Sequence, residues 1–380
     1  MLDSILRPVT LPRSLLGSTA PCDLFNARGT LLLRSGAPIP PHVESSRHRN
    51  RVFCLASHAE QISAADPVGD LKKLAARLSA LAEKIEFRQP ASARGLIELA
   101  EGLFALWSQD ADACLGYVRR VRVARPSVHH AVHAALLAAE LAAANGSSRP
   151  ATLNLIGAAL TMNVGSMILH DEMFDLVGEP DAPTQDDIHV HPAEAARLLE
   201  RLGGLPDEWI TTVLESHERL DGSGYPLGLR RAEISLLARM LHVADTLAAC
   251  LGGRRARPPR AWLLNQTRDT RRLGRHVFGR DAERLDQSLV RLMLGRLSAF
   301  PPGTLVRLSN GEVGVVARRE SRSAWQPQAA LAIVSAHGRL LEVPRARQLN
   351  ARELRVVAYV EEAPARLAHV DWPGLWGYRH

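Results

Sequence analysis

Helical periodicity over the middle of the chain is the feature that most constrains the fold. From residue 66, in "DPVGDLKKLAARLSALAEKI", leucines and alanines recur at helical spacing, and "ARGLIELAEGLFALWSQ" repeats the pattern. Between about 110 and 297 the pattern continues, interrupted only by short Gly, Pro and Asn stretches such as "ANGSSRP" and "GGLPDEW". The sequence therefore predicts a mainly α protein built on a helical bundle.

Two smaller modules are expected on either side of the helices. Residues 23–36 indicate two strands joined by a turn, which favours a small N-terminal β or α+β module. After residue 299 β-branched residues alternate, and Asn310-Gly311 between two such runs is a strong hairpin signal, so a small β domain of four or five strands is expected. We expect an N-terminal module at 1–65, a helical connector at 66–125, a helical core domain at 126–297, a small β-barrel-like domain at 299–362 and a tail at 363–380.

Composition indicates a soluble cytoplasmic protein. The chain has 380 residues, 46% of them hydrophobic and 23% charged, with four scattered cysteines and no C-x-x-C, which fits a reducing compartment. The longest apolar run contains Glu140 and is shorter than the ~20 residues of a membrane span, and the N-terminus lacks a signal peptide's apolar core, so no span is expected. The arginine-rich segment 254–276 lacks interleaved aromatics, so we interpret it as a solvated face and expect no nucleic acid partner.

Four polar residues interrupt apolar helical faces and suggest one polar centre. A helix beginning near Asp207 would carry His217 on the same face as two apolar residues, and His130 lies on an alanine-rich stripe. His191 precedes Pro192, which suits the first position of a helix. Asp245 lies on an apolar face, where a carboxylate must be hydrogen-bonded, paired or metal-bound.

The segment "SHERLDGSGYPLGL", residues 216–229, predicts a loop that faces a ligand rather than an ordinary surface turn. Its glycines permit positive φ and close approach of the backbone, while the Tyr-Pro pair supplies a stiff wall that could stack on a planar group. The candidate ligand-binding residues are Glu218, Asp221, Gly222, Gly224, Tyr225 and Pro226.

This loop, followed by "EISLLARMLHVADTL", resembles the HD-GYP family, and the resemblance covers about residues 126–297. It implies the HD-superfamily helical bundle and a metal-dependent phosphohydrolase that cleaves the bacterial second messenger cyclic di-GMP. The family's initial His, third His, last His of the His-His pair and downstream Asp fall on residues that we take as candidate metal ligands: His130, His191, His217 and Asp245.

The resemblance fails at the paired positions. With Gly165 and Asp171-Glu172 aligned to the family's glycine and Asp-Glu, the family's His-Asp pair falls on Met162 and Asn163. Ser166 replaces the family's lysine and Ser216 the first histidine of the His-His pair. Using the literal His170-Asp171 as the metal pair would shift the motif by eight residues and lose these matches.

The departures imply a degenerate active site. A neutral Asn163 is a poor bridge between two metals, and Met162 offers only a soft thioether to a site that favours iron or manganese. We expect no metal or one weakly bound divalent ion, with Glu172 as a further potential ligand, and no confident catalytic residue.

Three functions remain open from the sequence. The first is a bacterial signalling protein that senses cyclic di-GMP or docks a partner such as a diguanylate cyclase. The second is a residual one-metal cyclic di-GMP phosphodiesterase, and the third is a regulatory protein of the broader HD superfamily acting on another nucleotide.

Overall fold

A computed structural model describes residues 6–10, 19–26, 29–39, 51–55, 58, 66–176, 181–252, 279, 284–319, 327, 329–350, 352–360, 365–376 and 378. The chain divides into two compact units, one of residues 1–70 with 371–380 and one of residues 71–370. The arginine-rich segment 254–276 lies outside the described residues.

The first unit contains a small antiparallel sheet with the strand order β1-β4-β2-β3. Its strands are β1 (Leu6–Thr10), β2 (Leu24–Phe25), β3 (Leu31–Leu33) and β4 (Arg51–Leu55). The predicted turn lies between β2 and β3, where Thr30 N–H donates to Asn26 Oδ1 at 2.9 Å and Gly29 has a φ of 75°. The core of the sheet includes Cys22, Leu24 and Cys54. The same unit contains the short helix α12 (Trp372–Leu375).

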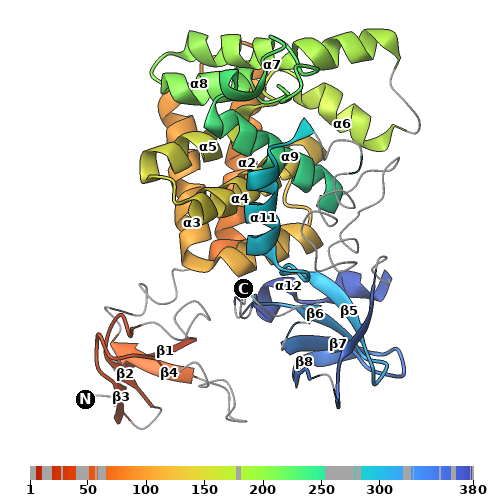
Figure 1. The fold of residues 1–380 in the computed structure, drawn as a ribbon. Coiled ribbons are helices and arrows are strands. Elements are labelled where there is room, and N and C mark those ends of the chain that lie inside the picture. The colour runs from red at the N-terminus through yellow and green to blue at the C-terminus, as the bar shows by residue number, and fades with distance from the viewer. Residues whose placement is uncertain are drawn as a thin grey trace. The chain divides into compact units, whose positions relative to one another are not determined.

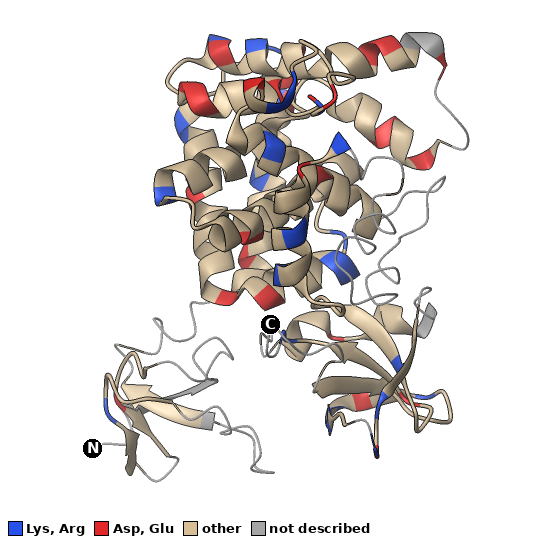
Figure 2. Ribbon diagram, in the orientation of Figure 1, with Lys and Arg blue, Asp and Glu red and all other residues tan. Residues whose placement is uncertain are grey.

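The second unit is mainly helical, as the periodicity predicts (Figure 1). Its helices are α2 (Pro67–Glu86), α3 (Ala93–Arg120), α4 (Pro126–Asn145), α5 (Arg149–Thr161), α6 (Met167–Asp175), α7 (Ala182–Leu202), α8 (Asp207–Leu214), α9 (Leu236–Gly252) and α11 (Gln287–Leu297), with 3-10 turns η3 (Arg231–Glu233) and η6 (Ala365–His369). Among the described residues no helix is long and apolar enough to cross a membrane. Figure 2 shows acidic and basic residues mixed along these helices rather than gathered by sign.

Helix α4 is the central helix of the bundle. It packs against α3, α5, α6, α9 and α11, and its residues 131–142 are all buried. A helix that is apolar on every side belongs in a core, and its many alanines let neighbouring helices approach closely. This helix also carries His130, so the fold holds one candidate ligand on its most buried element.

The C-terminal part of the second unit is a five-stranded antiparallel sheet with the order β8-β7-β6-β5-β9. Its strands are β5 (Thr304–Leu308), β6 (Val313–Val316), β7 (Ala329–Val334), β8 (Leu340–Gln348) and β9 (Val356–Tyr359). The predicted Asn310-Gly311 hairpin joins β5 to β6, and Gly311 has a φ of 86° that suits a residue without Cβ.

Buried ion pairs join this sheet to the helices. Glu140 of α4 is fully buried and accepts hydrogen bonds from Arg319, which follows β6, from Arg296 of α11 and from Trp107 of α3. Arg319 Nε also donates to Asp112 at 2.5 Å. The glutamate that interrupts the apolar run of α4 therefore anchors the end of a strand.

Two local predictions about helix bounds are wrong. The helix that carries His191 begins at Ala182, so Pro192 lies inside α7 and not at its first position. Helix α8 ends at Leu214, so His217 lies in the turn that follows and not on the helical face.

Candidate functional site

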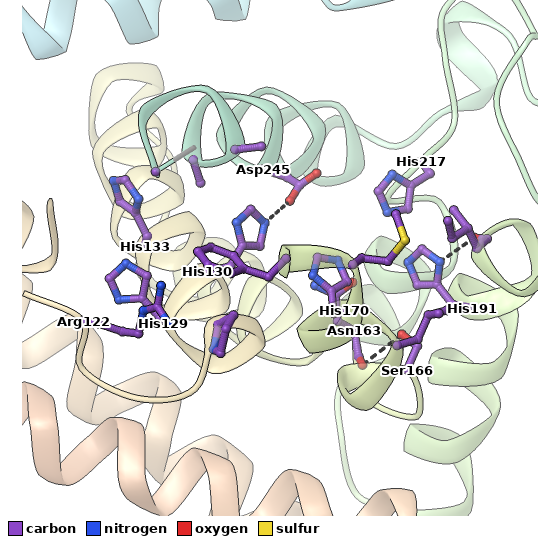
Figure 3. A pocket seen from close by; sticks show the side chains of 18 of the residues that line it. Arg122, His129, His130, His133, Asn163, Ser166, His170, His191, His217 and Asp245 are labelled. Carbon is purple, nitrogen blue, oxygen red and sulfur yellow. Dashed lines mark hydrogen bonds and ion pairs between the residues drawn. The ribbon is translucent and has the colours of Figure 1, made fainter. Parts of the chain in front are cut away.

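One cavity of about 300 Å³ collects the predicted polar centre (Figure 3). Helices α4, α6, α7 and α9 contribute to its wall, together with the turn after α5 and the loop after α8. The four candidate ligands all line it. Its other polar or aromatic lining residues are Arg122, His129, His133, Asn163, Ser166, His170, Phe174 and Tyr225.

His191 is oriented by the proline that follows it. Pro192 has no N–H, so the carbonyl of Ile188, four residues earlier, lacks its helical donor. His191 Nδ1 lies 2.6 Å from that carbonyl oxygen and supplies the missing donor. The Nε2 atom is then left as an acceptor, and it is buried without a partner within the protein. This is how a metal-binding or ligand-binding imidazole is commonly held, with one nitrogen fixed and the other free.

His217 and Tyr225 form an aromatic wall beside His191. The rings of His217 and Tyr225 stack with centroids 5.1 Å apart, and the His191 ring lies 4.9 Å from that of His217. Burial lowers the pKa of His217 well below its ordinary value, and the neighbouring His191 adds to that effect. The imidazole is therefore neutral at physiological pH, with a lone pair available to a ligand.

His130 and Asp245 satisfy each other. His130 Nε2 lies 2.7 Å from Asp245 Oδ1, which provides the partner that the buried carboxylate requires. Burial by itself would raise the pKa of Asp245, but the hydrogen bond from His130 and the nearby imidazoles lower it below its ordinary value. Both side chains are thus held in place without any further ligand.

Of the four positions predicted to be degenerate, Asn163 and Ser166 line the cavity, whereas Met162 and Ser216 do not. Asn163 is 2% exposed, and neither its Nδ2 nor its Oδ1 has a hydrogen-bond partner in the protein. Ser216 Oγ is likewise buried and unpartnered, while Ser166 Oγ donates to the Asn163 carbonyl oxygen at 3.1 Å. Met162 is 1% exposed. Gly165 has a φ of 90°, which an L side chain rarely adopts, and this explains why the turn after Asn163 needs a glycine.

These donors do not fit a pair of metal ions. Within the described ranges no three His, Cys, Asp or Glu side chains are grouped closely enough to hold a metal. If the alignment predicted from the sequence holds, Asn163 brings a neutral amide in place of the bridging carboxylate of the resembled family, and Ser216 a hydroxyl in place of an imidazole. The unpartnered Nε2 of His191 fits a single cation or another hydrogen-bonding ligand.

The loop after His217 is built largely around one carboxylate. Glu218 is 2% exposed and accepts hydrogen bonds from the N–H groups of Leu227, Gly228 and Leu229 at 2.6, 3.1 and 2.9 Å. A Cβ on Gly224 would lie 2.6 Å from the carbonyl oxygen of His217. That glycine therefore allows the loop to fold back on itself.

Most of the other loop residues predicted to bind a ligand make contacts within the loop and do not line the cavity. Asp221 is exposed and accepts from Ser223, and a Cβ on Gly222 would lie 2.8 Å from Cγ of Arg230. Of the six loop residues predicted to bind a ligand, Tyr225 lines the cavity, whereas the other five, Pro226 included, do not. Glu172 lies exposed on α6 and does not line the cavity either.

Sequence reasoning missed part of the cavity. His170 lines it, and its ring stacks on His130 with centroids 5.6 Å apart, although His170-Asp171 was not predicted to be the resembled family's His-Asp pair. His129 and His133 line it as well. Their i, i+4 spacing in "HHAVH" was the available signal, since it places both on one side of a helix.

The helical part of the chain is similar to a known protein family. Residues 111–264 match the HD domain family. The chain is 28% identical to the cyclic di-GMP phosphodiesterase PA4108 of Pseudomonas aeruginosa over 225 residues, which are 57% of this chain and 51% of that protein. It is 30% identical to the 3'3'-cGAMP-specific phosphodiesterase 3 of Vibrio cholerae over 120 residues, which are 31% of this chain and 25% of that protein.

A third curated relative is the cyclic di-GMP phosphodiesterase response regulator RpfG of Xanthomonas campestris pv. campestris, 37% identical over 92 residues, which are 23% of this chain and 24% of that protein. The chain thus spans about half of the first of these relatives and about a quarter of the other two. Among solved structures, Bd1817, an HDG"Y"P protein from Bdellovibrio bacteriovorus, aligns with a TM-score of 0.48 and 14% identity over 76% of this chain and 98% of that one. Residues 111–264 are thus similar to the HD domain family, and the chain is similar to cyclic di-GMP phosphodiesterases.

Proposed function

We propose that this protein is a bacterial cytoplasmic signalling protein that binds a cyclic dinucleotide, cyclic di-GMP first, in the cavity and does not hydrolyse it efficiently. The observation that carries the proposal is Asn163, a neutral and unpartnered amide where the bridging carboxylate of the resembled family belongs. Homology to phosphodiesterases of cyclic di-GMP and 3'3'-cGAMP supports the ligand class.

The carboxylates near the cavity support binding over hydrolysis. Two-metal hydrolases lower the pKa of the attacking water from ~15.7 toward ~7, and a general base alone contributes only ~10² to 10⁴-fold. Glu218 is occupied by three backbone N–H groups, and Glu172 and Asp221 are exposed and do not line the cavity. None of the three is therefore placed to activate water there.

Isothermal titration of the purified protein with cyclic di-GMP, and separately with 3'3'-cGAMP, tests the binding proposal. We expect saturable binding of at least one nucleotide, with no linear product after prolonged incubation. If neither nucleotide releases heat at high micromolar concentration, ligand sensing is refuted, and docking of a partner such as a diguanylate cyclase remains to be tested by co-purification.

The second candidate is a residual phosphodiesterase with one divalent ion, iron or manganese. It is favoured by His191, whose Nε2 is oriented and unpartnered. Here His130, His191, His217 and Asp245 would hold the ion, and at least one of them would have to move toward the others, because no three are grouped closely enough among the described residues. Stoichiometric metal together with turnover that His217→Ala abolishes would establish this candidate and overturn the first.

A repair experiment tests the alignment on which both candidates rest. The triple variant Met162→His, Asn163→Asp and Ser216→His restores the ligands that the resembled family has at these positions. We expect its metal content, measured on protein purified without chelator, to exceed that of the unmodified protein, and adding His191→Ala to reverse the gain. Unchanged metal content in the triple variant would contradict the alignment.

A further inference from the structure

The cavity extends beyond the candidate ligands into a second lobe. Figure 3 shows Arg122, His129 and His133 gathered at one end, on the opposite side of His130 from His191 and His217. We call these three residues the basic lobe. Phe174 of α6 also lines the cavity, and the Arg122 guanidinium lies over its ring, 4.5 Å from the centroid.

His129 presents an N–H donor in this lobe. The backbone N–H of Val123 donates to His129 Nδ1 at 3.4 Å, which makes Nδ1 the acceptor nitrogen. In the neutral imidazole the proton then resides on Nε2. The main chain thereby selects the tautomer that can donate from Nε2.

His133 offers a buried group that lacks a partner. Its side chain is 2% exposed and lines the cavity, and Nε2 has no hydrogen-bond partner within the protein. Leaving a buried polar group unsatisfied is costly, so a ligand that satisfies it gains affinity. This atom is an independent sign that the lobe is built to receive a polar group.

Charge decides which polar group fits. Within the described part of the chain Arg122 forms no ion pair, and the only carboxylate that lines the cavity is Asp245, which is bonded to His130. A cation in the basic lobe would meet the guanidinium of Arg122, whereas an anion would gain a charge-assisted hydrogen bond from it.

We propose that the basic lobe is a phosphate subsite, in which Arg122, His129 and His133 hold a phosphate group of the nucleotide bound in the cavity. This inference rests on the proposed function for the identity of the nucleotide, but the subsite itself depends only on phosphate chemistry. It makes binding of the nucleotide independent of any metal and places one phosphate away from His191 and His217.

The test compares Arg122→Gln with Arg149→Gln in the full chain. Arg149 also lies over a phenylalanine, Phe104, with its guanidinium carbon 5.6 Å from the ring centroid, but it does not line the cavity. A lost hydrogen bond to a charged group corresponds to about 10- to 100-fold in affinity. We expect Arg122→Gln to weaken cyclic di-GMP binding by about that factor in chelator-treated protein, and Arg149→Gln to leave it unchanged.

A second variant, His133→Gln, and a second ligand, GMP, distinguish a failure of the phosphate subsite from a failure of the proposed nucleotide. His133→Gln keeps a polar side chain, and we expect it to weaken binding while the circular dichroism spectrum stays that of the unmodified protein. If cyclic di-GMP binds and neither variant changes its affinity, the phosphate subsite is refuted while the proposed function stands. If cyclic di-GMP fails to bind but GMP binds and loses affinity with Arg122→Gln, the subsite is supported and the proposed ligand is wrong. If neither nucleotide binds, the subsite is refuted.

Discussion

Replacing Glu140 with alanine tests the buried ion pairs that join the sheet to the helical core. The carboxylate accepts from Arg296 Nε at 2.6 Å, from two nitrogens of Arg319 at 2.8 Å and from Trp107 Nε1 at 2.9 Å. Two carboxylates, Glu140 and Asp112, face two arginines in this network. Glu140→Ala leaves one carboxylate against two partly buried guanidinium groups.

The expected cost is large because the pair is desolvated. Removing one partner of a buried ion pair costs ~3–5 kcal/mol, against a total stability of ~5–15 kcal/mol for a typical protein. Glu98 is the matched control, since it also pairs with two arginines, Arg77 and Arg94, but its side chain is 45% exposed. Glu98→Ala should cost no more than ~1 kcal/mol.

Urea unfolding of the full chain, followed by far-ultraviolet circular dichroism, measures both losses. Glu140→Gln keeps one acceptor oxygen but removes the charge and places an NH2 donor against N–H donors, so its free energy of unfolding should also fall well below that of the unmodified protein. Equal losses for Glu140→Ala and Glu98→Ala would refute the argument that burial makes the network stabilising.

Two further predictions concern packing and pH. Gly157→Ala should destabilise the protein by ~1–3 kcal/mol because its Cβ would overlap the ring of Trp209, whereas Gly295→Ala on α11 meets nothing within 4 Å and should stabilise by up to ~1 kcal/mol; thermal unfolding of the two variants checks the difference in sign. The hydrogen bonds from Arg347 lower the pKa of Glu312 from 4.5 to about 2, so this carboxylate stabilises the fold above pH 4.5 and the contribution is lost as the pH falls toward 2. Glu312→Gln should therefore flatten the acid side of the stability profile measured by urea unfolding between those pH values, and an unchanged profile would contradict the assignment.

Much of the fold could be predicted from short stretches of sequence, because residues close together in the chain determine its turns, helices and strands. The hairpin at Asn310-Gly311 follows from a turn type that requires a positive φ. The helical periodicity predicted the bundle, and the alternating strand patterns predicted the two small sheets. The requirement that a carboxylate on an apolar face find a partner predicted that Asp245 would be bonded, and the structure shows His130 as the partner.

Other features depend on contacts that no local pattern contains. Pro192 suggests a helix start, yet α7 continues through it because the imidazole of His191 replaces the missing donor to Ile188. Glu140 and Arg319 are 179 residues apart, so their ion pair has no signature in the sequence around either residue. His170 lies on α6, and it lines the cavity because α6 packs on α4.

Four residues in or next to the cavity bury polar atoms that lack a partner in the protein. Asn163, Ser216, His191 and His133 each bury at least one polar atom without a partner in the protein. Each such atom costs ~1–3 kcal/mol, and small apolar residues like the alanines of α4 would remove that cost. Three of the four, Asn163, His133 and His191, line the cavity, so under the proposed function a ligand with several hydrogen-bonding groups would offset this cost. Under the proposed function, a cyclic dinucleotide would offer its phosphates and base edges to these atoms.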